Sequence, residues 1–305
     1  MKIKEFLQNV KLDDSVKKRL SFVWEDIEQY IEKLSHYNKT AQEIFLRDYL
    51  FKENVDSSKL ERTLYSPAVE VLYDEGAMNE TKINEELIKL LNASVRCNDK
   101  ILDRETFEKI REEKNKDITY QEYVKEEKSN LSGNYRMIPV WIGDSNGINY
   151  AVHIPPAPEE IETYMKEFVE YYNNLQGNEL DDPIVKSALI HVLFIKIHPF
   201  SNGNGRCARI LLNKYLKTAI NIKYDKNFKY PIINLSKSFD LTRLTYFDKQ
   251  NAIRFKNDID NNEAINAWIK YIIMMIGEQL YYLNNRLDSY HDFLSSLNDK
   301  SFKIN

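Results

Sequence analysis

The residues best suited to chemistry lie together between positions 198 and 209. His198 can accept a proton near neutral pH. A short connection follows, with Gly203 and Gly205 letting backbone approach a ligand closely, and then an apolar helix begins. Unpaired amides and the positive end of the helix dipole make such a start an anion site, which Arg206 and Arg209 can extend toward a polyphosphate. A base beside a phosphate cradle indicates attack by a hydroxyl on phosphorus.

This run resembles the signature of the Fic family, His-Pro-Phe-x-(Asp or Glu)-Gly-Asn-Gly-Arg-x-x-Arg. The sequence reads His-Pro-Phe-Ser-Asn-Gly-Asn-Gly-Arg-Cys-Ala-Arg and departs from it only at Asn202. The similarity covers roughly residues 50–275. It extends to Gly133–Arg136, Trp141–Gly143, Ile154–Glu160, Ala188–His191 and, more weakly, 234–246.

The resemblance implies transfer of AMP from ATP, accompanied by Mg²⁺, to a Tyr, Thr or Ser hydroxyl of a protein, the chain itself included. His198 would take the proton of that hydroxyl as it attacks the α-phosphate. Phe200 would anchor the loop in the core. The remaining roles implied are phosphate binding by the backbone of Gly203, Asn204 and Gly205, with the Asn204 side chain, and binding of the β- and γ-phosphates by Arg206 and Arg209.

Asn202 stands where the family usually has a carboxylate that helps to hold Mg²⁺. An amide oxygen can bind a hard cation but adds no negative charge, so weak metal binding is expected. Three alternatives stay open. The protein could be a transferase with low metal affinity, a phosphate-ester transferase of other specificity that could also remove AMP, or a nucleotide-binding regulatory module.

Residues 57–62 are similar to the inhibitory segment of the family, (Ser or Thr)-x-x-x-Glu-(Gly or Asn). Ser57 and Glu61 match and Arg62 does not. The resemblance predicts an ion pair between Glu61 and Arg209 that occupies the place of the γ-phosphate. The chain would then inhibit itself.

The elements that position the loop are expected to be helices. Only 8 Gly and 8 Pro interrupt 305 residues, and apolar residues recur at spacings of three and four. Helices are predicted over 161–175, 184–197 and 206–216. The fold class is therefore mainly α, a Fic-type helical bundle with a single β-hairpin flap. We expect an N-terminal helical region at 1–80, a Fic core at 81–275 and a C-terminal helix at 276–305.

The exception to this helical pattern is a predicted hairpin before residue 155. Ile148, Tyr150, Val152 and Ile154 alternate with less apolar residues, after an Asn-Gly pair typical of tight turns. Residues 137–142 would form the other strand. The resemblance implies that this flap pairs with an extended segment of the target protein and sets its hydroxyl in register.

Composition excludes several other classes of function. The net charge of −4 gives no general attraction to nucleic acid or to an anionic membrane, and no apolar run is long enough to cross a bilayer. Cys97 and Cys207 lack metal-ligand spacing, and a reducing cytoplasm fits them best. The expected partners are ATP and a protein substrate with an exposed hydroxyl in an extended segment. The sequence leaves a homodimer open.

Overall fold

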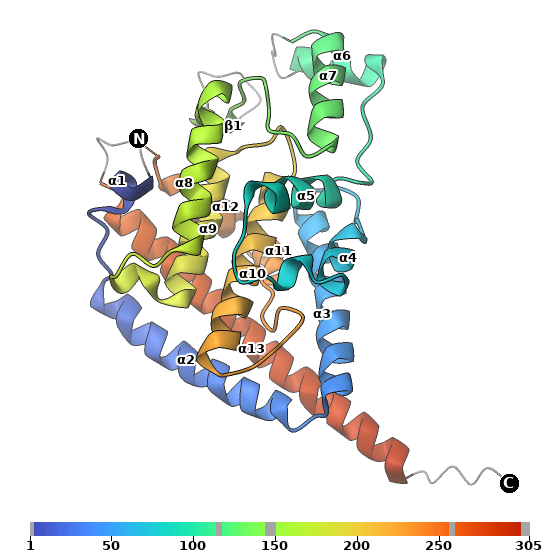
Figure 1. The fold of residues 1–305 in the computed structure, drawn as a ribbon, viewed down its shortest axis with the longest axis vertical. Helices are drawn as coiled ribbons and strands as arrows, with labels where there is room; N and C mark the ends of the chain where they lie inside the picture. Colours follow the sequence, from blue (N-terminus) through green and yellow to red (C-terminus); the bar gives the residue numbers. More distant parts are fainter. Residues whose placement is uncertain (1–2, 114–117, 144–150, 256–259, 300–305) are drawn as a thin grey trace, which may run out of the picture.

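The computed structural model describes residues 3–113, 118–143, 151–255 and 260–299, and they form a mainly helical protein (Figure 1). The helices are α1 (Ile3–Leu7), α2 (Asp14–Ser35), α3 (Lys39–Leu60), α4 (Ala68–Asp74), α5 (Glu85–Val95), α6 (Arg104–Glu113), α7 (Tyr120–Leu131), α8 (Ile161–Asn173), α9 (Pro183–Ile197), α10 (Asn204–Lys223), α11 (Ser236–Leu241), α12 (Arg243–Ala252) and α13 (Asn262–Asp299). Short 3₁₀ helices within the described ranges lie at Ala77–Asn79, Pro158–Glu160 and Glu179–Asp181. The strands are β1 (Ile142–Gly143) and β2 (Ala151–His153).

Helices α9 and α10 pack against each other at the centre of the molecule. Helix α9 is apolar on all sides, as expected of a helix buried on every face. Asp182 caps its start by accepting hydrogen bonds from the amides of Ile184 and Val185 at 2.9 and 3.3 Å, and Pro183 occupies its first position. The pair therefore holds the connection between them, residues 198–203, at a fixed place.

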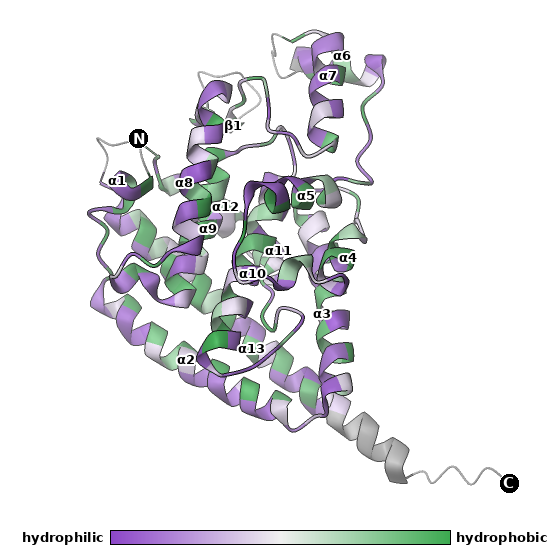
Figure 2. Cartoon of the chain, in the orientation of Figure 1, coloured by the Kyte–Doolittle hydropathy of each residue, from purple (hydrophilic) through white to green (hydrophobic). Residues whose placement is uncertain are grey.

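The N-terminal helices belong to the same hydrophobic core as α9 and α10. Helix α2 lies along α13, and α3 packs against α11. Figure 2 shows hydrophobic and hydrophilic residues recurring around α2, the pattern of a helix with one buried face. The boundary expected between residues 275 and 276 falls inside the continuous helix α13, so it does not separate two elements.

The structure contains the expected hairpin in a shorter form. Strands β1 and β2 are antiparallel, with Ile142 opposite His153. Of residues 137–142, only Ile142 is in a strand. Pro139 cannot donate a ladder hydrogen bond, and the amide of Met137 instead donates to the carboxylate of Glu126 at 3.0 Å.

The four flap residues fall partly within the described chain. Val152 lies in β2 and is half-buried, whereas Ile154 follows the strand and is 58% exposed. Ile148, Tyr150 and the Asn-Gly turn lie outside the described residues. Their predicted roles stay predictions.

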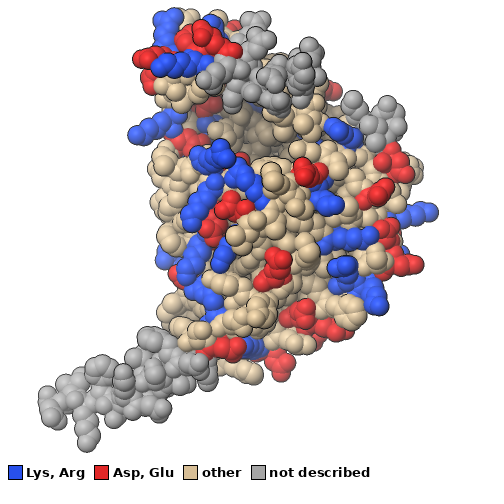
Figure 3. Space-filling view, turned by 180° about the vertical axis from the view of Figure 1, so that it is seen from behind, with Lys and Arg blue, Asp and Glu red and all other residues tan. Residues whose placement is uncertain are grey.

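Helices α6 and α7 project from the rest of the bundle at the top of Figure 1, joined to it mainly through α5. The face shown in Figure 3 carries basic and acidic side chains interspersed with neutral ones. None of the described helices has the length and hydropathy needed to cross a membrane.

Candidate active site

The connection from α9 to α10 changes direction through two residues in left-handed conformations. His198 ends α9 with φ of 50° and ψ of 58°, and Gly203 precedes α10 with φ of 82°. A Cβ on Gly203 would also lie 2.8 Å from Nδ2 of Asn92, so the position needs glycine for two reasons. Helix α10 begins at Asn204, two residues before the predicted start. The first-turn amides of Asn204, Gly205 and Arg206 thus lack partners within the helix.

The His198 side chain is half-buried beside this helix start. Its Nδ1 lies 3.3 Å from the carbonyl oxygen of Ile195, which can only accept. Nδ1 therefore carries the proton, and Nε2 keeps a free lone pair. Burial lowers the pKa of His198 to about 4, so the ring is neutral near pH 7. A neutral imidazole with a free Nε2 is a competent proton acceptor.

Asn204 fixes the shape of the loop with its side chain. Its Oδ1 accepts from the amide of Phe200 at 3.1 Å, and its Nδ2 donates to the Phe200 carbonyl at 2.8 Å. The Phe200 ring is fully buried, as expected for an anchor. Both polar atoms of the Asn204 side chain have partners within the loop, and its binding of phosphate stays a prediction. Its backbone amide remains at the helix start.

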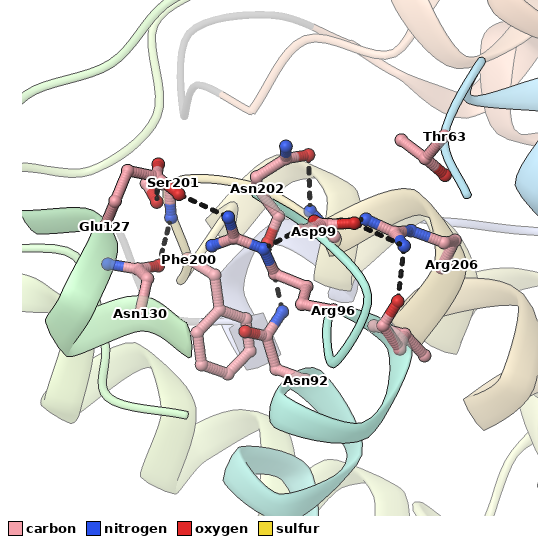
Figure 4. Close-up of polar contacts among 12 residues, drawn as sticks. Thr63, Asn92, Arg96, Asp99, Glu127, Asn130, Phe200, Ser201, Asn202 and Arg206 are labelled. Atoms are coloured by element: carbon pink, nitrogen blue, oxygen red, sulfur yellow. Dashed lines mark hydrogen bonds and ion pairs between the residues drawn. The ribbon is translucent and has the colours of Figure 1, made fainter. Parts of the chain in front are cut away.

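Side chains from α5 and α7 hold the loop from the outside (Figure 4). Asn130 accepts a hydrogen bond from the Ser201 amide at 2.7 Å, and the Ser201 hydroxyl donates to Glu127 at 3.2 Å. Asn92 donates to the carbonyl of Asn202 at 3.0 Å. Arg96 is 2% exposed and pairs with Glu127 and with Asp99. The loop conformation is therefore fixed by helices 70 to 110 residues away in sequence.

Arg206 belongs to this outer network, and its binding of phosphate stays a prediction. Its guanidinium is 2% exposed, donates to the carbonyl of Val95 and pairs with Asp99 at 3.1 Å. Withdrawing it toward a ligand would leave Asp99 with Arg96 alone and break a largely buried pair, which is costly. In this structure Arg206 ties the start of α10 to the end of α5.

Arg209 is held by the segment at the end of α3. Its Nε donates to the Ser57 hydroxyl at 2.9 Å, and its Nη2 donates to the Ser57 carbonyl at 3.0 Å. Its Nη1 lies 2.9 Å from Oε1 of Glu61 and 3.2 Å from the Tyr246 hydroxyl. The ion pair expected between Glu61 and Arg209 is present, whereas its inhibitory effect stays a prediction.

The Glu61 carboxylate also lies directly on the helix start. A Cβ on Gly205 would be 2.1 Å from Oε1 of Glu61, closer than any real contact. Gly205 is therefore the residue that lets the carboxylate approach the first turn of α10. The chain's own carboxylate thus lies beside the helix start at which the sequence predicted an anion site.

Asn202 offers little to a metal ion in this arrangement. Its Oδ1 accepts from the amide of Gly203 at 2.7 Å. The nearby carboxylates of Asp99 and Glu127 are paired with Arg96 and Arg206. Within the described ranges, no three His, Cys, Asp or Glu side chains gather as metal ligands. These residues do not fit a resident metal, so any Mg²⁺ would depend on the phosphates it arrives with.

Three further side chains that could do chemistry are held by the surrounding helices. His191 is buried and hydrogen-bonded to the Tyr246 hydroxyl at 2.9 Å, and burial lowers its pKa. Cys207 is buried with its pKa raised to about 12 by burial, so it is an inert thiol. His153 is half-buried, with Nε2 2.7 Å from the carbonyl oxygen of Lys196.

Residues 102–216 match the model of the Fic/DOC family, which spans the loop and the helices around it. The chain carries a Fic/DOC-family domain. It is 34% identical over 115 residues to the protein adenylyltransferase Fic of Nematostella vectensis, covering 36% of this chain and 25% of that protein. It is 31% identical over 120 residues to the protein of the same name from Drosophila grimshawi, covering 38% of this chain and 23% of that protein. The chain thus spans about a quarter of the length of these relatives.

The Fic domain also has counterparts among solved structures. A Fic family protein from Desulfovibrio desulfuricans superposes with a TM-score of 0.50 at 14% identity, over 90% of this chain and 76% of that one. At this identity the likeness concerns the fold alone. It agrees with the mainly helical bundle predicted from the sequence.

Sequence reasoning missed several residues that shape the site of this Fic domain. One of them is Arg136, whose guanidinium donates to the carbonyls of His198, Ile138 and Pro156 and so braces the loop against the flap base. The others missed are Asn92, Arg96, Asp99, Glu127, Asn130 and Tyr246. Their contacts join distant segments, and no local pattern marks them.

Proposed function

We propose that this chain transfers AMP from ATP to a hydroxyl side chain of a protein. The observation that carries the proposal is the neutral His198, with Nε2 free, at one end of a loop whose other end is the open first turn of α10. Such a turn binds phosphate through its amides and dipole. The Fic/DOC match and the names of the curated relatives support the same activity.

The reaction follows from these positions. The target oxygen forms a bond to the α-phosphorus, the bond from that phosphorus to the bridging oxygen breaks, and pyrophosphate leaves. Nε2 of His198 accepts the proton of the attacking hydroxyl. Amides of the α10 start stabilise the charge that develops on phosphate oxygens, the expected main source of rate. Mg²⁺ enters as part of the substrate, bound to the ATP phosphates.

Arg209 would bind the outer phosphates once it is released from Glu61, and Arg206 would keep the helix start in place. Glu61 neutralises Arg209 and lies against Gly205, where a phosphate oxygen would otherwise sit. A carboxylate in that position repels the triphosphate and competes for its arginine. Glu61 thus inhibits transfer in the state that the structure describes.

The protein substrate would pair an extended segment with the edge of the flap. Strand β2 ends at His153, three residues before Pro156, whose carbonyl accepts from Arg136. Arg254 supports the strand by donating to the Val152 carbonyl at 2.5 Å. Main-chain pairing would set the acceptor hydroxyl in register without demanding a sequence. Nucleic acid and membranes are not proposed as partners.

The experiment is intact-mass spectrometry of the chain after incubation with ATP and Mg²⁺. Glu61→Gly should gain the mass of AMP on itself or on an added protein, more than the unaltered chain does. His198→Ala in the Glu61→Gly background should gain none. Equal labelling with and without His198 would overturn the proposal.

A second candidate function is favoured by Asn202, whose side-chain oxygen is bonded to the Gly203 amide. The protein would then bind ATP and act as a nucleotide-dependent regulator without transferring AMP, or would move a different phosphate group. ATP labelled on the α- or the γ-phosphate separates the two transfers. Binding by calorimetry without either label moving, even in Glu61→Gly, would favour the regulator.

A further inference from the structure

A cavity lies between α3, the start of α11 and α13. It is separate from the anion loop, by which we mean residues 198–203 and the first turn of α10. Its volume is about 200 Å³, room for a group the size of a nucleobase. Tyr49 and Lys52 line it from α3, Asn234 and Lys237 from the α11 end, and Tyr282 from α13. The mechanism proposed above uses none of these residues.

Asn234 has unmet hydrogen-bonding capacity. It is 1% exposed, and neither its Nδ2 nor its Oδ1 has a partner among the described residues. The neighbouring lining groups are satisfied: Tyr49 donates to Oε1 of Gln279 at 2.6 Å, and Glu53 accepts from the Ser236 amide at 2.9 Å. Burying both ends of an amide unpaired is unfavourable, and such a group in a native protein calls for a partner.

The chemistry of the lining specifies the partner. A carboxamide offers one donor and one acceptor side by side, which complements the edge of an adenine ring. The ring of Tyr282 is half-buried at the cavity, with Nζ of Lys237 4.2 Å from its centroid. Lys237 and Lys52 are exposed, and Lys237 can meet an anion directly. Lys52 can do so by exchanging its exposed ion pair with Asp48, 2.7 Å away, which contributes little to stability. The buried floor of the cavity therefore suits a nucleobase, and its exposed rim suits a phosphate.

We propose that this cavity is a second nucleotide site, which holds the adenine ring of a nucleotide on Asn234 and its phosphate between Lys52 and Lys237. The ring fills the cavity, and the sugar and phosphate extend to the exposed rim. The site is separate from the anion loop and needs no catalysis to be occupied.

Occupation would act on α3, whose last residue is followed directly by Glu61. Glu53 lines the cavity and accepts from Nδ2 of Asn213 in α10 at 3.0 Å, while Asp56, also in the lining, directly precedes Ser57. The cavity exists in the state in which Glu61 contacts Arg209. A ligand that fits it stabilises that state, so it should reduce transfer. This effect rests on the proposed function, whereas the binding does not.

The test is isothermal titration of the whole chain with adenosine, which lacks the phosphates that the anion loop requires. Asn234→Leu keeps the size of the side chain and removes both polar groups, and Asn285→Leu, at an exposed position of α13, is the matched control. We expect adenosine to bind the unaltered chain and Asn285→Leu alike, and Asn234→Leu roughly 10-fold more weakly or worse. Because the Asn234 amide is unpaired, Asn234→Leu should unfold at the same temperature or a higher one.

Two results would overturn the site. One is equal adenosine affinity in Asn234→Leu and the unaltered chain, and the other is no adenosine binding at millimolar concentration. AMP should bind several-fold more tightly than adenosine, and Lys52→Ala with Lys237→Ala should remove that difference. A difference that survives both changes would refute the phosphate assignment. These titrations keep their meaning even if no AMP transfer is found.

Discussion

Asn202 is the residue at which this Fic domain departs from the family pattern, and its surroundings set what a carboxylate there would do. The Gly203 amide already donates to its side-chain oxygen at 2.7 Å, a bond that Asp can also accept. Asn202→Asp should therefore leave the loop in place while adding the charge that a hard cation favours. We expect half-maximal AMP transfer at several-fold lower Mg²⁺, measured in the Glu61→Gly background. An unchanged Mg²⁺ requirement would show that the phosphates alone determine metal binding.

Glu61 offers a graded test of self-inhibition. Glu61→Gln keeps the size of the side chain and a neutral hydrogen bond to Arg209, but loses the charge. Charged hydrogen bonds contribute about 1.5–3 kcal/mol and neutral ones about 0.5–1.5 kcal/mol, so Gln should relieve inhibition less than Gly does. Initial rates of self-labelling should rank Gly above Gln above Glu. Glu25→Gln, the same change at an exposed position of α2, is the control and should match the unaltered chain.

At the scale of elements, α7 acts on the loop through Glu127 and Asn130. Glu127→Gln removes a carboxylate that pairs with the 2% exposed Arg96, so it should lower the free energy of unfolding by about 2 kcal/mol. Glu105→Gln disrupts an exposed pair with Lys109 on neighbouring α6 and should cost less than about 0.5 kcal/mol. Urea unfolding of both variants measures the difference. Equal losses would mean that the network around Arg96 contributes no more than a surface pair.

The sequence alone predicted the central helices and the loop of the Fic domain. It did not predict the distant residues that hold them in place. Helix α9 and the loop could be predicted because an apolar run, a histidine and closely spaced glycines are local signals. The start of α10 was placed two residues late because Asn204 looked like a ligand-binding loop residue, whereas its side chain closes the turn on Phe200.

Arg206 shows why the rest could not be predicted. Its spacing from Arg209 is that of two residues on one helix face, yet Asp99 and the Val95 carbonyl draw it to α5 while Ser57 and Glu61 hold Arg209 to α3. The partner of a buried cation is decided by which distant helix packs beside it. No local pattern in one sequence carries that information.

At the scale of the whole molecule, three buried or half-buried histidines make stability depend on pH. Burial lowers the pKa of His153 and of His198 to about 4 and that of His191 well below its usual 6.5. Below pH 6.5 the unfolded chain binds protons that the folded chain does not, so folding weakens as pH falls from 6.5 toward 4. Each fully buried histidine contributes at most about 1.4 kcal/mol per pH unit in that window.

The measurement is urea unfolding at pH 7.5, 6.0 and 5.0. We expect the free energy of unfolding to fall steadily as the pH drops below 6.5. His153→Asn should make the fall less steep, because one group that resists protonation has been removed. His36→Asn, in the connection after α2, should leave the slope unchanged. A fall that begins only below pH 4.5 would assign the acid sensitivity to carboxylates instead.

The packing of α2 along α13 limits how the ion pair between Glu61 and Arg209 can be broken. Helix α3 is fastened to the same framework, since Tyr49 bonds Gln279 of α13 and Glu53 bonds Ser236 of α11. We therefore expect that removing the first helices exposes the apolar face of α13 that α2 covers and lowers the free energy of unfolding. Any release of Arg209 from Glu61 would then take place with these helices still packed.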